Sequence, residues 1–509
     1  MPPWVRVLAI DSALLVGWLA SASAVVLHDR GHVWGNTVNP TTALHTSFGI
    51  NEQWFGLYYQ DQKVGYAQTT LVPEERNGIP GVVLSDRGRF AFTLLGVPQH
   101  VELSMRAFID ADWRLQTVEA SVHSDAYQLS WSGHREGSRL VLTMSTGESR
   151  STTRLDDPGG GTIVMGLSPW TAFHRLRVGQ WGSMWVINPL ALKPEQVYFH
   201  VRGRERMDGK DALVIETELR GLTTTSWVTP EGDVLREDSP LGWTLVRESM
   251  EQALQHASDL PAADLLSTTA VPIDRTFDQP ERLTRLVWLL EGASAESLAV
   301  SRPWQRLLSP ETLSRAHLQP PQGEWCLVEL TRPAVSETPS SAFPRSLERY
   351  RQPSPFVQSD DPRILAAARE AVGALEDPWP RVTALNRWVY RTLAKRLTVG
   401  LPSALDVLNS KSGDCHEHTV LFTALARSLG LPTRMVAGLV YYDGRLFYHA
   451  WPEVWLNGSW VPTDPTLGQP VADATHLGLT EAEHEALISI GQFVGKLRVR
   501  VLEADEGPE

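Results

Sequence analysis

A cysteine, a histidine and an aspartate follow one another over a short part of the C-terminal half of the sequence: Cys415, His449 and Asp464. A thiol becomes a strong nucleophile when a base removes its proton and a third group orients that base. The three residue types, in this order, therefore predict a nucleophile, a general base and an orienting acid. We expect the elements around them to bring the three side chains together.

Cys415 is expected at the start of a helix. It follows a loop-type run, and residues 416–429 carry leucines at helical spacing. Gly430 and Pro432 come directly after this stretch and are typical of a helix C-terminus. The partial positive charge at a helix N-terminus favours a thiolate, so we expect the pKa of the Cys415 thiol to be lowered.

His449 and Asp464 are expected on neighbouring strands. Three β-prone runs follow the helix and are separated by the turn signals Asp-Gly and Asn-Gly: residues 434–442, 445–456 and 460–464. With a two-residue second turn, Trp451 faces Asp464, and His449 becomes a diagonal neighbour within side-chain reach of that carboxylate. The same count puts Gly438 opposite His449, where a glycine leaves room for the helix that bears Cys415.

Residues from about 359 to 468 resemble the transglutaminase-like superfamily, whose core is related to papain-type cysteine proteases. The resemblance is carried by Ser403-Ala404, Val407-Leu408, Gly413-Asp414-Cys415, Glu417-His418, Ala426-Arg427, Gly430-Leu431-Pro432-Thr433-Arg434, Tyr448-His449-Ala450-Trp451, Glu453-Val454, Trp460-Val461-Pro462 and Asp464-Pro465-Thr466. It implies Cys415 as nucleophile, His449 as base and Asp464 as orienting acid.

Each of the three residues also has a structural interpretation. Cys415 alone would be a small buried hydrophobe, His449 a hydrogen-bonded core histidine and Asp464 the start of a turn. We expect structural roles for three neighbours of the cysteine, Asp414 as a helix N-cap and Glu417 and His418 as packing or capping residues.

A metal site is the rival chemistry. Cys415, His416, His418 and His449 are all ligand types, but their spacing matches no closed zinc pattern, and positions 416 and 418 do not share a helix face. We therefore predict no metal and no cofactor. Cys326, the other cysteine, lies in a strand-like run, and we expect it to be buried and inert rather than disulfide-bonded to Cys415.

Composition excludes several function classes. The chain has 509 residues and a formal net charge of -13, which argues against nucleic acid as a partner. The sequence contains no phosphate-binding loop and no dinucleotide fingerprint. We expect a protein or peptide substrate. The sequence does not indicate an oligomeric state.

The N-terminus predicts a membrane segment. Residues 7–27 are largely apolar and have the length of a membrane span, with Arg6 before and Arg30 after them. We expect an uncleaved anchor, with the remaining chain outside the cytoplasm, in the periplasm of a Gram-negative bacterium. The alternative is a signal peptide cleaved after Ala22-Ser23-Ala24, which would give a secreted protein.

Four regions are expected. They are a membrane anchor or signal segment (1–30), a β-rich domain with a connector (31–272), a small β domain with a linker (273–355), and a transglutaminase-like, papain-like core that ends in an acidic, disordered tail (356–509). The predicted fold class is α+β, with an N-terminal membrane helix, a large antiparallel β region and the C-terminal core.

The sequence is compatible with two classes of function. The first is a thiol-dependent acyl-transfer enzyme, an amide or peptide hydrolase or a transamidase, because an acyl-enzyme can be resolved by water or by an amine. The second is a catalytically silent, membrane-tethered binding or assembly module that uses the core as a scaffold.

Overall fold

The computed structural model describes most of the chain. The described ranges are 25–27, 51–94, 97–111, 114–156, 176–188, 193–219, 222–230, 232–240, 242–255, 270–298, 302–315, 318–335, 344–396, 400–481 and 490–507. Two compact units are present, one made mainly of residues 265–509 and the other of most residues before 265.

The N-terminal unit is a single sheet of 15 strands. In spatial order the strands are β1 (Val25–Leu27), β10 (Trp181–Asn188), β11 (Lys193–Met207), β12 (Lys210–Leu219), β13 (Leu222–Val228), β14 (Val234–Asp238), β15 (Trp243–Glu248), β2 (Asn51–Tyr59), β3 (Gln62–Arg76), β4 (Ile79–Leu94), β5 (Val97–Asp110), β6 (Leu115–Ser124), β7 (Gln128–Glu136), β8 (Arg139–Thr146) and β9 (Ser149–Asp156). A short helix, α2 (Met250–Leu254), follows β15.

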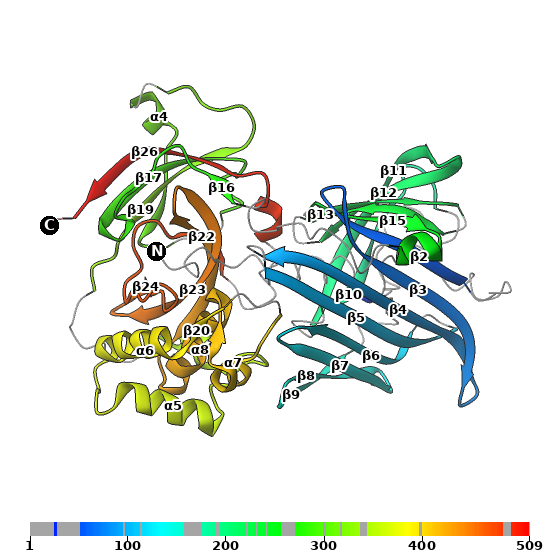
Figure 1. The fold of residues 1–509 in the computed structure, drawn as a ribbon, viewed down its shortest axis with the longest axis horizontal. Helices are drawn as coiled ribbons and strands as arrows, with labels where there is room; N and C mark the ends of the chain where they lie inside the picture. Colours follow the sequence, from blue (N-terminus) through cyan, green and yellow to red (C-terminus); the bar gives the residue numbers. More distant parts are fainter. Residues whose placement is uncertain are drawn as a thin grey trace. The chain divides into compact units, whose positions relative to one another are not determined.

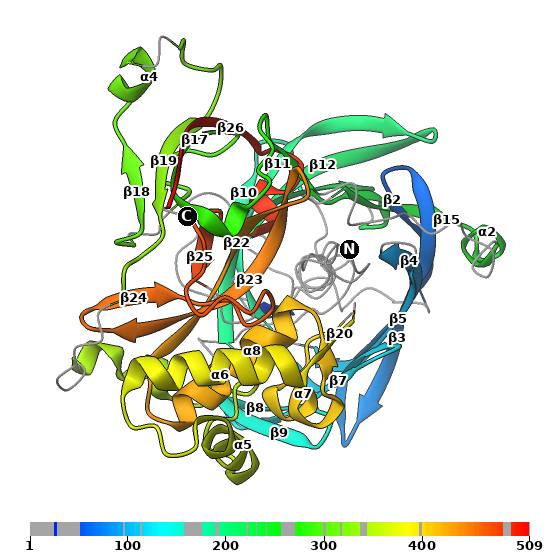
Figure 2. The ribbon, with the colours of Figure 1, turned by 60° about the vertical axis from the view of Figure 1, so that its left-hand side comes forward.

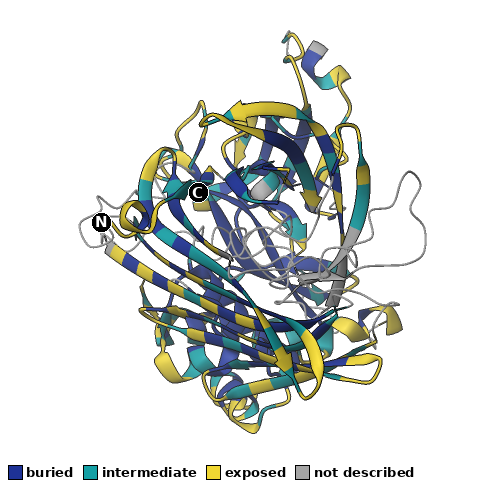
Figure 3. Cartoon of the chain, turned by 90° about the vertical axis from the view of Figure 1, so that its right-hand side faces the viewer, coloured by how far each residue is buried: buried dark blue, intermediate teal, exposed yellow. Residues whose placement is uncertain are grey.

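The sequence shows why this region forms hairpins. Asn77-Gly78 and Asp208-Gly209 have positive φ at both positions, the backbone conformation that matches a two-residue hairpin to the twist of its strands. Along the strands buried residues alternate with exposed ones, as Figure 3 shows for the large sheet. The large antiparallel β region expected within residues 31–272 is therefore present.

The C-terminal unit holds three smaller sheets. A five-stranded sheet contains β16 (Val271–Pro272), β23 (Arg445–Leu456), β22 (Thr433–Tyr442) and β25 (Leu477–Glu481), with β24 (Ser459–Pro462) paired to β23. A four-stranded sheet contains β18 (Gln305–Leu308), β19 (Trp325–Thr331), β17 (Leu283–Glu291) and β26 (Arg498–Glu506). Two short strands, β20 (Ala394–Lys395) and β21 (Ser412–Gly413), pair in parallel.

Four helices pack together in this unit. They are α5 (Pro362–Val372), α6 (Pro378–Thr392), α7 (Ala404–Ser410) and α8 (Cys415–Ser428). Shorter helices are η4 (Pro280–Arg282), α4 (Glu311–Arg315), η5 (Arg345–Arg351) and η7 (Gly491–Phe493). In Figures 1 and 2, helices α5–α8 and the four-stranded sheet lie at opposite ends of the unit, with β22 and β23 between them.

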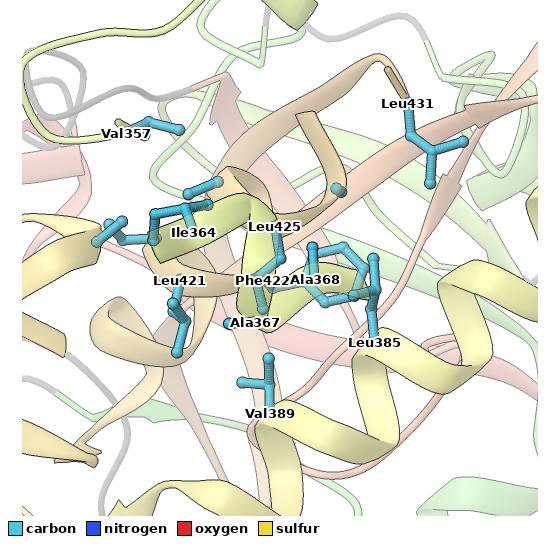
Figure 4. Close-up of a cluster of buried hydrophobic side chains, with 14 of the residues drawn as sticks. Val357, Ile364, Ala367, Ala368, Leu385, Val389, Leu421, Phe422, Leu425 and Leu431 are labelled. Atoms are coloured by element: carbon cyan, nitrogen blue, oxygen red, sulfur yellow. The ribbon is translucent and has the colours of Figure 1, made fainter. Parts of the chain in front are cut away.

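Helix α8 is the centre of the main hydrophobic core. All of its residues except Ser428 are buried, so it is surrounded by protein rather than lying on the surface. Figure 4 shows Leu421, Phe422 and Leu425 of α8 among side chains of the neighbouring helices. The start of α8 is therefore held in place from several sides.

A buried ionic network fixes β23 from the other side. The Arg302 and Arg434 guanidiniums donate to opposite oxygens of the Glu453 carboxylate, at 2.8 and 2.7 Å, and Arg434 also contacts Glu481. The side chains of Arg302 and Glu453 are fully buried. A buried charge is tolerated only when it is paired in this way.

The predicted fold class is wrong. The part of the chain that the structure describes is mostly β, with 53% strand and 18% helix, and is not the α+β protein expected. The physical reason is the length and number of the antiparallel strands before residue 250, which outweigh the few helices of the C-terminal unit.

The expected membrane helix is also not borne out. Val25–Leu27, the end of the expected span, form strand β1 and pair with β10, and residues 7–24 lie outside the described residues. Among the helices that the structure describes, none is long and apolar enough to cross a membrane. The expected location outside the cytoplasm, which rested on this segment, is untested.

The acidic tail is not disordered as expected. Residues 503–506 belong to β26, which pairs with β17 in an antiparallel register. Arg285 of β17 donates to the carboxylates of Glu503 and Asp505, so opposite charges across the two strands offset the repulsion within the tail. The sequence signal for this strand was the alternation of charged and apolar residues over most of the stretch 498–505.

A single methyl group added at position 438 should destabilise the fold. A Cβ at this position would lie 1.9 Å from the Leu477 carbonyl oxygen on β25. The backbone on both sides is held in sheet pairing, so Gly438→Ala should lower the free energy of unfolding by at least about 2 kcal/mol. Calorimetric unfolding checks this. Gly203→Ala, where a Cβ meets open space, is the control and should shift stability by less than about 1 kcal/mol. Equal effects would contradict the interpretation.

Candidate active site

Cys415 is the first residue of α8. Asp414 is the N-cap, and its carboxylate accepts from the His416 N–H at 2.9 Å, while Glu417 accepts from the Asp414 N–H at 2.9 Å. This reciprocal capping box confirms the structural roles expected for Asp414 and Glu417. A Cβ on Gly413 would lie 2.3 Å from the Glu417 side chain, so glycine is required for this close return.

Strand β23 brings the histidine to the cysteine. The backbone N–H of Ala450 donates to the Cys415 Sγ at 3.3 Å. His449 is the preceding residue in the same strand, so its backbone lies beside the residue that contacts the thiol. Both side chains are fully buried, with Cys415 0% and His449 1% exposed.

His449 and Asp464 are hydrogen-bonded. The Nε2 of His449 donates to Oδ2 of Asp464 at 2.7 Å. The strand register that predicted this contact is correct, because Leu456 pairs with Ser459 and Gly438 with His449. The interpretation of Gly438 was wrong in one respect: the space beside it is filled by β25 and the Trp451 ring, not by α8.

The loop after β24 fixes the other oxygen of Asp464. Oδ1 accepts from the backbone N–H groups of Thr466 and Leu467, at 2.7 and 3.0 Å. The carboxylate is therefore oriented by its own chain, and Oδ2 alone is presented to the imidazole of His449.

A second histidine, which the sequence analysis missed, shares this oxygen. The Nε2 of His476 lies 3.1 Å from Oδ2 of Asp464, and its Nδ1 lies 3.1 Å from Oδ1 of Asp473. His476 directly precedes β25 and is fully buried. The only local signal is an aspartate three residues before a histidine, which on its own is too weak to identify a site.

Trp451 packs against both histidines. Its ring stacks on His449 with centroids 6.0 Å apart, and it meets the His476 ring edge-on at 5.1 Å. The two imidazoles are therefore held in fixed planes by the packing of the tryptophan ring.

The charges of the site follow from burial and pairing. Burial alone would raise the pKa of Asp464, but its interactions with His449 and His476 outweigh burial and hold this pKa well below its usual range. Burial alone would lower the pKa of His476, yet the Asp473 charge, with Asp464, raises it to about 9. Asp464 is thus an anion and His476 a cation at neutral pH.

The expected lowering of the Cys415 pKa is wrong for this conformation. Burial and then the Asp414 charge raise the pKa of the thiol well above its ordinary value, and the hydrogen bond from Ala450 offsets this only in part. Complete removal from water outweighs the helix N-terminus, so the resting thiol is neutral.

The nearby histidines of α8 do not join the site. Burial lowers the pKa of His418 to about 4, and its Nδ1 donates to the Asp414 carbonyl oxygen at 2.5 Å. Burial also lowers the pKa of His416. Both are neutral helix residues, which agrees with the structural role expected for His418.

One group of side chains has the composition of a metal site. His449, Asp464 and His476 each offer a ligand atom, and these atoms lie within 4.8 Å of one another. A metal does not fit them as they stand, because all three atoms are already joined by hydrogen bonds and the described residues supply no fourth ligand to the group. We therefore assign no metal site.

Cys326 is separate from the site. It is free, buried in β19, and burial raises the pKa of its thiol to about 12. The expectation of a buried, inert cysteine without a disulfide to Cys415 is confirmed.

The charge on His476 predicts a pH dependence of stability. The native state holds this proton more tightly than the unfolded chain, whose histidine pKa is about 6.5. The resulting stabilisation, about 3 kcal/mol, is complete below about pH 6.5 and is lost as the pH rises through 9. Urea unfolding of the wild type and of His476→Gln between pH 6 and 10 should therefore give curves that converge at high pH. Parallel curves would show that His476 is neutral.

A comparison with known protein families identifies part of the chain. Residues 366–465 match the family model described as the transglutaminase-like superfamily. A search of curated proteins finds no match.

Three solved structures are similar at low scores. A "Putative Cysteine Protease" from Cytophaga hutchinsonii is 17% identical over 45% of this chain and 89% of that chain, with a TM-score of 0.29. A β-barrel-like protein of unknown function from Brucella abortus is 8% identical over 39% and 95%, with a TM-score of 0.27. A "Putative Protease" from Parabacteroides distasonis is 9% identical over 55% and 68%, with a TM-score of 0.18. At these TM-scores none of the three similarities supports a conclusion about the fold or the function of this chain.

The family match runs from residue 366, inside α5, to the loop after β24, and so includes Cys415, His449 and Asp464. Residues 366–465 of this chain are a transglutaminase-like domain.

Proposed function

We propose that the chain is a thiol-dependent acyl-transfer enzyme that acts on amide or peptide bonds. The observation that carries the proposal is the direction of the His449 ring. Its Nε2 is committed to Asp464, and its buried Nδ1 has no hydrogen-bond partner among the described residues. That nitrogen is the one left to exchange a proton with Cys415.

The reaction divides into two steps. Sγ of Cys415 attacks the substrate carbonyl carbon while Nδ1 of His449 takes the thiol proton, and a carbon–sulfur bond forms. The imidazolium returns this proton to the leaving amine as the carbon–nitrogen bond breaks. Water or a second amine then attacks the thioester carbon, gives its proton to His449, and restores the thiol of Cys415. Asp464 stabilises the imidazolium throughout.

The developing oxyanion requires hydrogen-bond donors. The backbone N–H of Cys415 lies in the first turn of α8, where backbone N–H groups have no acceptor within the helix. Its position at a helix start adds a favourable partial charge, and it is our candidate for one donor.

General-base activation is needed because the resting thiol is neutral. The raised pKa of Cys415 means that few thiolates are present at neutral pH, so the proton must leave during attack. The full burial of Cys415 further means that a substrate reaches it only after a part of the chain moves. The proposed substrate is a peptide or protein segment.

The burial of Cys415 also favours a second candidate. A core whose cysteine never meets substrate would be a scaffold, and the chain would be a binding or assembly module. This alternative accounts for the closed thiol, but it gives no reason for a buried histidine held by a carboxylate with its second nitrogen unpaired. We therefore favour the enzyme.

An acylation experiment separates the two. Full-length protein is incubated with p-nitrophenyl acetate, and acetylation of the cysteine peptides is followed by mass spectrometry. We expect acetyl transfer to Cys415, none in Cys415→Ala, and a rate at least about 100-fold lower in His449→Ala, since general-base assistance contributes at least this factor. Cys326→Ser is the matched control and should react as the wild type does.

The second half-reaction then identifies the acceptor. Loss of the acetyl group in buffer alone indicates a hydrolase, whereas loss that accelerates with an added primary amine indicates a transamidase. Absence of acetylation at Cys415, or equal acetylation with and without His449, would contradict the proposal and leave the scaffold interpretation.

A further inference from the structure

His476 differs from His449 in what its two nitrogens face. Nε2 faces the Asp464 carboxylate and Nδ1 faces that of Asp473. A carboxylate can only accept, so both nitrogens of this ring must donate, and an imidazole with two N–H groups is a cation. His449, by contrast, faces a carboxylate with Nε2 alone.

Asp473 is itself fixed for this contact. Its Oδ1 accepts from the backbone N–H and the hydroxyl of Thr475, at 2.8 and 2.6 Å, and its Oδ2 accepts from Gln469 at 2.8 Å. All four groups of the chain Asp473, His476, Asp464 and His449 are buried. These contacts therefore begin at Asp473, which is not one of the three predicted site residues, and the surrounding hydrogen bonds fix their geometry.

The charges along this chain explain what His476 contributes. With His449 neutral, two carboxylates and one imidazolium leave a net charge of about minus one; protonation of His449 brings it to zero. Without the His476 cation, the negative charge of the two carboxylates would no longer be offset, and it would favour the protonated form of His449, which cannot accept a proton from a thiol.

Other charged groups lie nearby. Lys395 interacts electrostatically with Asp464 and with His418, and its ammonium lies 3.6 Å from the centre of the Tyr390 ring. Asp414 and Glu417 lie at the start of α8 and act on Cys415. His476 shares the oxygen of Asp464 that His449 uses, so its charge acts directly on the hydrogen bond between these two residues.

We propose that His476 is a positioning residue for the acyl-transfer reaction: held by Asp473, it fixes Oδ2 of Asp464, and its positive charge favours the unprotonated form of His449, the form that can act as a base. The inference rests on the proposed function, in which His449 is that base. It adds a second histidine and a second aspartate to the three residues that the sequence identifies.

The test measures the protonation of both histidines in the full-length protein labelled with ¹³C and ¹⁵N histidine. His476 signals are those missing in His476→Gln, and His449 signals those missing in His449→Ala. We expect both ring nitrogens of His476 to be protonated at pH 7.5. In His476→Gln the titration midpoint of His449 should rise by about one pH unit or more, the effect of removing a neighbouring positive charge.

Acetylation of Cys415 supplies the functional readout. In His476→Gln the rate should fall about 10-fold near pH 7 and recover towards the wild-type rate as the pH is raised past the new His449 midpoint, since one pH unit corresponds to a factor of ten. A merely structural role would give a loss that higher pH does not restore. His134→Gln, an exposed histidine beside Glu136 in the other unit, is the matched control and should change neither readout.

Asp473→Asn keeps the test decisive if His476→Gln does not fold. This variant should lower the titration midpoint of a single histidine, His476, by about one unit or more. The inference is overturned if His476 carries only one ring proton at pH 7.5, or if the His449 midpoint does not move when His476 is replaced. If the wild type is not acetylated at Cys415, the proposed function fails instead, and the two histidine midpoints still report whether the coupling exists.

Discussion

The buried carboxylate of Asp464 is the constraint on which the site depends. An anion removed from water needs compensating donors from all sides, and here they come from three separate parts of the chain. The loop after β24 holds one oxygen, while β23 and the residue before β25 supply the two imidazoles on the other. Moving any of these segments would leave a buried charge unpaired, so the carboxylate fixes the segments as much as they fix it.

The thiol of Cys415 is equally buried but stays neutral, whereas Asp464 is an anion. Pairing stabilises the Asp464 anion, but among the described residues Cys415 has only one weak donor, the Ala450 N–H, and two acidic residues at the helix start oppose a thiolate. A neutral nucleophile beside an oriented base is a resting state that needs the base for reaction. It also protects the thiol from adventitious chemistry while the site is closed.

The local geometry of the site could be predicted because it depends on short-range rules. The two-residue turns at Asp443-Gly444 and Asn457-Gly458 have positive φ at all four positions, and these turns determine the register of β22, β23 and β24. Once the register is known, the contact between His449 and Asp464 follows. The start of α8 was likewise visible from its apolar spacing and from its N-cap.

The rest depended on long-range packing, which leaves little trace in one sequence. His476 is brought to Asp464 by the pairing of β25 with β22, across a coil that has no periodicity. The thiol pKa follows from burial that no local pattern reveals. The tail strand β26 is stabilised by partners about two hundred residues earlier, such as Arg285. The fold class was wrong because the long strands before residue 250 contain far more residues than the helices around the cysteine.

The dependence of thiol reactivity on His449 tests the central claim most directly. We would measure the rate of Cys415 alkylation by iodoacetamide from pH 5 to 10 in full-length Cys326→Ser, with and without His449→Ala. Any opening that admits the reagent precedes reaction in both proteins, so the ratio of rates isolates the base. The account predicts a rate near pH 7 that falls at least about 10-fold when His449 is removed, because a general base assists attack. Equal rates, rising together only above the ordinary thiol pKa of about 8.5, would contradict it.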